Sequence, residues 1–94
     1  MSATVVLPQR LDLPAARPLA RSLMEMAGQN LRIDAEGVGF LGGLCLQVLL
    51  AAGIEWRQSG KSLSIEPRSP EFDLALRQFG LSAVDLATEP QPWV

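Results

Sequence analysis

The longest stretch of this chain without a charged side chain runs from residue 37 to residue 54, between Glu36 and Glu55. A run of this length can just span a bilayer, or it can form a helix that is buried on one side of a small domain. Glycines crowd its first half, Gln47 lies in its middle, and both flanking residues are acidic, whereas the cytoplasmic flanks of membrane helices favour Lys and Arg. We therefore expect a buried helix and no membrane insertion.

The composition fits one small domain and excludes several kinds of chemistry. The chain has 94 residues, a formal net charge of −2, no His and a single Cys. Zinc sites, Ser-His or Cys-His nucleophile pairs and internal disulfides are therefore not expected, and a lone thiol fits a reducing cytoplasm. The slightly acidic balance also argues against a nucleic-acid partner. These features predict a cytoplasmic binding module that is not an enzyme and needs no cofactor or metal.

Extended and helical patterns alternate along the chain. Short extended segments are expected at residues 3–7, 31–34, 38–40 and 62–66, and helices at about 14–27, 43–58, 70–79 and 83–88. This alternation favours an α/β fold in which neighbouring strands are parallel and helices pack on the sheet. We expect a small mixed sheet of about four strands with three to four helices. The expected domain covers residues 1–88, and residues 89–94 form a proline-containing tail.

Several residues are expected to begin or end the helices. Asp12 is a candidate anchor for the first helix, and Gly60 is a natural end for the second. Ser69 followed by Pro70 predicts a capped start for the third helix, and Ser82 has capping-box spacing to residue 85. The third helix is expected to bury a stripe made of Phe72, Ala75, Leu76 and Phe79. Val38 and Phe40 are expected to point to the same side of their extended segment.

The second helix has two different faces on a helical wheel. Its expected core face consists of Cys45, Leu49, Ala52 and Trp56. The opposite face carries Leu44, Gln47, Ala51 and Ile54, and it has no charge. Such a face is covered by the protein itself, by a second copy in a homodimer or by a partner, and we favour a partner because the chain has few spare elements. Cys45 is expected to pack in the core rather than to act in redox chemistry.

The Gly42-Gly43 pair precedes the second helix. It either exposes backbone N–H groups to an anion or, more simply, permits a tight turn and the close approach of a partner. Asp34 ends a strand beside this loop without a second acid, base or nucleophile, so we expect it to accept hydrogen bonds from loop amides.

The order and spacing of several motifs resemble a STAS domain, the fold of sulfate transporters and anti-sigma-factor antagonists. The matching segments, which together cover roughly residues 4–86, are Leu11-Asp12-Leu13, Leu31-Arg32-Ile33-Asp34, Val38-Gly39-Phe40-Leu41, Leu46-Gln47-Val48-Leu49-Leu50, Ser69-Pro70-Glu71-Phe72 and Phe79-Gly80-Leu81. In this family an acid and two serines follow the strand that corresponds to Val38-Gly39-Phe40-Leu41. Here these positions hold Gly42, Gly43 and Leu44, so the phospho-acceptor serine is missing.

The resemblance implies docking onto a larger protein. The chain looks most like stand-alone STAS proteins encoded near bacterial chemotaxis genes, whose expected partners are signalling kinases or anti-sigma-type proteins. It is also similar to the small STAS subunit of lipid-transport ABC complexes, which implies a transporter ATPase as the alternative partner. The expected partner-binding residues are Leu41, Gly42, Gly43, Leu44, Gln47, Ala51 and Ile54.

Overall fold

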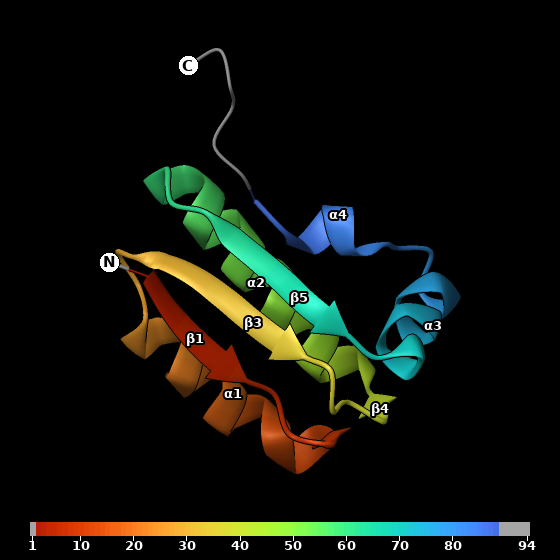
Figure 1. Cartoon of the computed structure of the whole chain (residues 1–94). Coiled ribbons are helices and arrows are strands. Elements are labelled where there is room, and N and C mark those ends of the chain that lie inside the picture. The colour runs from red at the N-terminus through yellow and green to blue at the C-terminus, as the bar shows by residue number, and fades with distance from the viewer. Residues whose placement is uncertain (1, 89–94) are drawn as a thin grey trace.

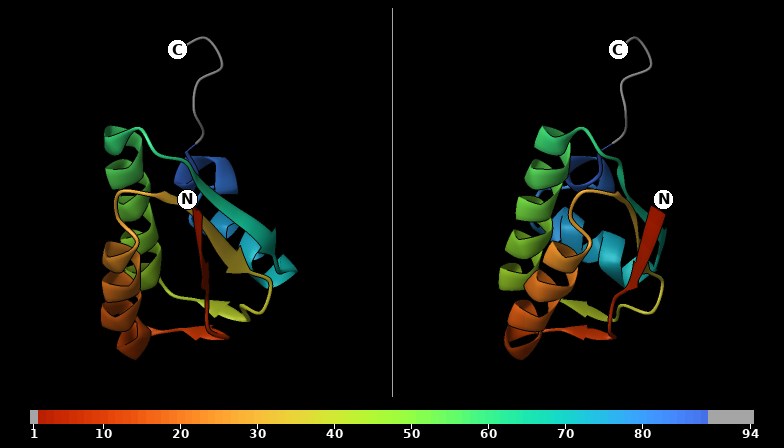
Figure 2. Two further views of the ribbon diagram at one scale, coloured as in Figure 1. Left: turned by 60° about the vertical axis from the view of Figure 1, so that its left-hand side comes forward. Right: turned by 90° about the vertical axis from the view of Figure 1, so that its left-hand side faces the viewer.

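A three-stranded parallel sheet covered by helices on one face forms the body of the protein (Figure 1). The computed structural model describes residues 2–88, and its main sheet has the order β1 (Ser2–Val6), β3 (Asn30–Ala35) and β5 (Leu63–Arg68). The helix α1 (Ala16–Glu25) connects β1 to β3, and α2 (Gly43–Ser59) connects β3 to β5. Both helices lie side by side on the same face of the sheet (Figure 2).

A second, smaller sheet lies at the end of the molecule where both helices begin, and its strand β4 (Phe40–Leu41) is labelled at the lower right of Figure 1. It pairs β2 (Arg10–Leu11) in parallel with β4, and a 3₁₀ turn, η1 (Leu13–Ala15), leads from β2 into α1. The expectation of one mixed sheet with about four strands was therefore wrong in detail. The described residues form five strands in two parallel sheets, and the antiparallel pairing seen among them is the isolated bridge between Leu63 and Thr88.

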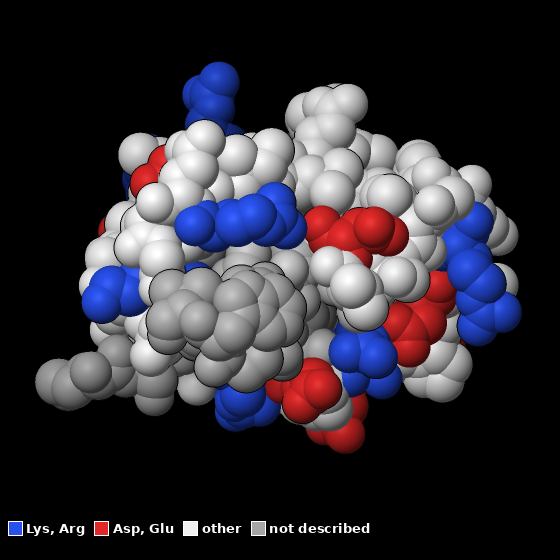
Figure 3. All heavy atoms as spheres, turned by 90° about the horizontal axis from the view of Figure 1, so that it is seen from above, with Lys and Arg blue, Asp and Glu red and all other residues white. Residues whose placement is uncertain are grey.

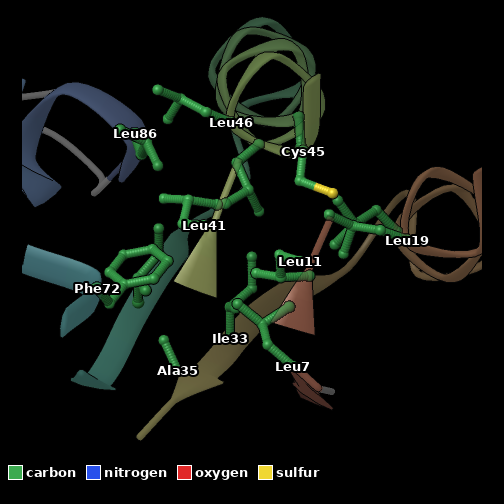
Figure 4. Close-up of a cluster of buried hydrophobic side chains, with 14 of the residues drawn as sticks. Leu7, Leu11, Leu19, Ile33, Ala35, Leu41, Cys45, Leu46, Phe72 and Leu86 are labelled. Carbon is green, nitrogen blue, oxygen red and sulfur yellow. The ribbon is translucent and has the colours of Figure 1, made fainter. Parts of the chain in front are cut away.

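The core lies between the main sheet and the helices (Figure 4). Cys45, Leu49, Ala52 and Trp56 are all buried, which confirms the predicted core face of α2. Trp56 also donates its Nε1–H to the Gln29 carbonyl oxygen at 2.8 Å. The short helix α4 (Ala83–Leu86) packs on the side of α2, so that a Cβ at Gly53 would lie only 2.5 Å from the Leu86 carbonyl oxygen.

The predicted helix ends are largely confirmed. Ser69 caps α3 (Pro70–Gln78) by accepting a hydrogen bond from the Phe72 amide at 3.0 Å, and the capping box at Ser82 is present. Gly60 ends α2 with a φ of +73°, a conformation that favours glycine. Asp12, in contrast, makes no side-chain capping bond and instead accepts from Arg10 Nε at 3.1 Å.

Two burial predictions were wrong. Val38 is buried whereas Phe40 is exposed, because Val38 lies between the turn at residues 36–37 and the start of β4, so the two residues do not belong to one continuous strand. Phe79 lies one residue beyond the end of α3 and is 49% exposed. Over residues 2–88 no helix has both the length and the apolar character that crossing a membrane requires. The expected proline-containing tail, residues 89–94, lies outside the described residues.

Candidate docking surface

Four of the predicted partner-binding residues form a continuous exposed side of α2. Leu44, Gln47, Ala51 and Ile54 are all exposed, and no charged residue separates them along the helix. Leu44 lies in the first turn of α2 and is 46% exposed, which is a large exposed fraction for a leucine. The structure therefore brings this part of the predicted site together.

The loop before α2 contributes less than the sequence suggested. Leu41 is only 4% exposed, because β4 pairs with β2 and turns this side chain into the core (Figure 4). Leu41 is therefore unavailable to a partner. Gly42 is half-buried, and its amide donates to the Leu11 carbonyl oxygen at 2.8 Å. Gly43 is exposed and remains part of the candidate surface.

Two aromatic rings flank the glycine pair. A Cβ at Gly42 would lie 3.4 Å from the ring of Phe40, and a Cβ at Gly43 would lie 3.7 Å from the ring of Phe79. The Arg10 guanidinium also lies 5.0 Å from the centre of the Phe40 ring, within cation–π range. Both rings therefore lie close to the glycine pair at the start of α2, while the closest approach to a Cβ at Gly42 would be the Leu11 carbonyl oxygen at 3.2 Å.

Sequence reasoning missed both rings for different reasons. The exposure of Phe40 was predictable, because consecutive residues of a strand point to opposite sides, so that either Phe40 or Leu41 had to face outward. No comparable signal existed for Phe79, because its spacing from Phe72 and Leu76 places it on the predicted buried stripe of the helix.

These exposed residues together form one candidate surface. We name it the docking patch, and it consists of Phe40, Gly43, Leu44, Gln47, Ala51, Ile54 and Phe79.

An apolar groove adjoins the docking patch between α1 and α2. Its volume is about 470 Å³. Its lining is apolar except for one carboxylate and consists of Ala20, Leu23, Met24, Ala27, Val48, Ala51, Ala52, Glu55 and Trp56. Ala51 belongs to both the groove and the docking patch, so the apolar surface continues from the start of α2 toward α1. The groove could not be predicted from the sequence of either helix alone, because it forms only where the two helices lie side by side.

The ionisable groups near the patch have structural roles. Cys45 is buried and donates its S–H to the Asp12 carbonyl oxygen at 3.3 Å. Burial, and secondly the charge of Asp12, raise the pKa of the Cys45 thiol, which keeps it protonated and unreactive. Asp34 accepts a hydrogen bond at 3.0 Å from the amide of Glu36, in the turn directly after β3, and the bonds found among the described residues include none to Asp34 from the loop before α2.

Charged side chains of both signs are mixed on one face of the molecule. On the face seen in Figure 3, basic and acidic side chains are interspersed with uncharged surface. The two ion pairs found among the described residues, Arg10–Asp12 and Arg68–Asp73, are both at the surface. Mixed charge on this face gives no large field of one sign there that would attract a polyanion.

Comparison with known proteins identifies the family. Residues 2–88 match the family model described as "Mlab, STAS domain". No curated protein and no solved structure matches the chain significantly. The match confirms the resemblance to STAS domains, while the finer likeness to chemotaxis-associated members stays a prediction. Since the matched segment spans nearly the whole of the 94-residue chain, the protein belongs to the STAS domain family that this model describes.

Proposed function

We propose that this chain is a non-catalytic docking module of cytoplasmic bacterial signalling, which binds a kinase or an anti-sigma-type protein through its docking patch. The observation that carries the proposal is the patch itself, in which Phe40, Leu44, Ile54 and Phe79 are large apolar side chains left in contact with water. STAS domains generally mediate protein–protein interaction, and an uncharged apolar surface of this kind is typical of a binding site.

The composition of the patch fits a protein partner. Aromatic side chains that are partly exposed at a surface often supply much of the binding energy once a partner covers them. Phe40 and Phe79 provide two such rings beside Leu44. The adjoining groove between α1 and α2 offers further apolar area on the same side of the molecule.

The docking patch has no residue that phosphorylation could switch. Residues 31–58 contain no Ser, Thr or Tyr, and Leu44 stands where the family resemblance places the phospho-acceptor serine. A phosphate there would add a charge of about −1.5 to −2 and disrupt apolar contacts. Leu44 is therefore proposed as a fixed apolar contact, so that binding is constitutive or is controlled elsewhere.

The variant Leu44→Glu tests the proposal. We expect it to fold normally, since the side chain is 46% exposed, and to lose its partner because a carboxylate replaces an apolar contact. The measurement is an affinity pull-down from native cell extract, read by mass spectrometry. Leu74→Glu is the matched control, because Leu74 is 53% exposed on α3 outside the patch, and it should retain the partner. Capture of the same partner by Leu44→Glu would rule the proposal out.

The resemblance to the small STAS subunits of lipid-transport ABC complexes supplies a second candidate partner. In that case the same patch would hold and stabilise a transporter ATPase. The identity of the protein that wild type captures and Leu44→Glu does not capture separates the two candidates. A signalling kinase or anti-sigma-type protein supports the first, and an ABC ATPase supports the second.

A further inference from the structure

The outer edge of β1 carries backbone groups that no described strand pairs with. β1 is an edge strand that pairs with β3 alone (Figure 1). The amide of Leu7, just after β1, donates to the Asp34 carbonyl oxygen at 2.9 Å, which shows that this residue faces β3. Successive residues of a strand direct their N–H and C=O groups to opposite edges. Thr4 and Val6 therefore direct theirs to the outer edge.

This edge lacks the usual protection against pairing. Natural edge strands carry charged residues, prolines or bulges that discourage the addition of another strand. Ser2–Val6 contains neither a charged residue nor a proline, and Thr4, Val5 and Val6 are β-branched residues that favour strands. Val6 is 70% exposed on the face of the sheet that lacks helices. The strand is thus well suited to accept a neighbour.

A groove runs beside the same edge, on the helix side of the sheet. Its volume is about 290 Å³, and its walls come from β1, the chain just after β1, and the first half of α1. Val5, Pro18 and Leu19 give it an apolar lining, and Arg10 is its one ionisable residue within the described part of the chain. A strand added at the edge would place every second side chain in this groove and the others beside Thr4 and Val6.

We propose that the outer edge of β1 binds an extended segment of a partner protein by β-strand addition. The segment would carry small apolar residues at alternate positions, and it would be uncharged, because Arg10, the one charged group among the described residues of the groove, is already paired with Asp12 at 3.1 Å. The backbone pattern of β1 selects an extended chain, because only a strand can pair with the outward groups of Thr4 and Val6 together.

A second copy of this chain fits the edge less well than a bare segment. Two-fold pairing of β1 with its copy would bring both α1 helices to the same side of the joined sheet. Neighbouring strands lie about 4.8 Å apart, whereas a helix with its side chains is about 10 Å wide. Since α1 already forms a wall of the groove at this edge, the second helix would have no room.

The groove shares no residue with the docking patch, although Arg10 of the groove lies 5.0 Å from the centre of the Phe40 ring. The test of the proposal begins with random peptides of about ten residues, displayed on phage and selected against the whole wild-type chain. We expect enriched peptides with apolar residues at every second position. When one of them is synthesised and titrated, the Thr4 and Val6 amide resonances should shift and become protected from hydrogen exchange.

The variant Thr4→Pro removes an outward N–H without touching the bonds to β3, and proline is tolerated on edge strands. It should weaken peptide binding about tenfold or more, while Thr4→Val should bind like wild type. Protected Val5 and Leu7 amides would show that Thr4→Pro is folded. If Thr4→Pro is not folded, protection of the Thr4 and Val6 amides in the wild-type complex decides whether the peptide pairs with the outer edge of β1. Leu44→Glu should leave peptide binding unchanged, which keeps this test separate from that of the docking patch.

Four results would overturn the inference. They are the absence of enriched peptides, enriched peptides with helical spacing of their apolar residues, equal binding to Thr4→Pro when that variant is folded, and a wild-type dimer that Thr4→Pro dissociates. The last result would identify a second copy of the chain as the occupant of the edge.

Discussion

Cys45 illustrates how one buried side chain couples the fold to pH. Its sulfur points from α2 into the core, near Leu19 of α1, and donates to the Asp12 carbonyl oxygen (Figure 4). Burial and then Asp12 raise the pKa of the thiol above its ordinary value. The folded state therefore keeps its proton at pH values where the unfolded chain loses it, and ionisation favours unfolding.

We expect Cys45 to have no effect on the pH dependence of stability below about pH 8 and to lower stability as pH rises above its ordinary pKa of about 8.5. The slope would reach at most about 1.4 kcal/mol per pH unit. Few other groups interfere, because the chain has no His or Tyr and one Lys. Denaturant unfolding between pH 7 and 10 measures the slope. Cys45→Ala should have a lower free energy of unfolding at every pH, but this free energy should depend less on pH. An equal pH dependence in both proteins would contradict the role given to the Cys45 thiol.

At the scale of elements, the Ser69 side chain makes two hydrogen bonds, one that caps α3 and one that connects α3 to the chain before β4. Its hydroxyl oxygen accepts from the Phe72 amide and its O–H donates to the Val38 carbonyl oxygen. Ser69→Ala removes both bonds in a buried place and should lower the free energy of unfolding by about 2–4 kcal/mol. Urea unfolding measures this loss. Ser82→Ala, in the exposed capping box of α4, is the control and should cost about 1 kcal/mol or less. Equal losses would show that the Val38 bond contributes nothing.

The elements that were predictable from sequence are those whose signals are local. Ser69, Ser82 and Gly60 each mark a helix boundary through bonds or dihedral angles within a few residues. The pairing of β2 with β4 involves only two residues on each side and depends on contacts between distant parts of the chain. No local pattern records such contacts. For the same reason Leu41 was misassigned to the surface and Phe79 to the core.

At the scale of the whole molecule, the two faces of α2 have different surroundings. One side of the helix packs on the sheet through Leu49 and its buried neighbours, while the opposite side carries the docking patch. Both sides are apolar, so hydropathy along the sequence cannot distinguish them. Only their angular position on the helix does, and this is why the predicted core face of α2 was correct.

A pair of matched substitutions on α2 tests this division. Leu49 is fully buried among apolar side chains, and a carboxylate there would lose its hydration without gaining a partner, at a cost of several kcal/mol. A chain of this size has a total stability of roughly 5–14 kcal/mol, so Leu49→Glu should abolish the cooperative thermal transition seen by circular dichroism. Leu44→Glu should keep that transition, because its side chain reaches water. If both variants unfolded alike, Leu44 would belong to the core, and loss of a partner by Leu44→Glu would report unfolding instead of a broken contact.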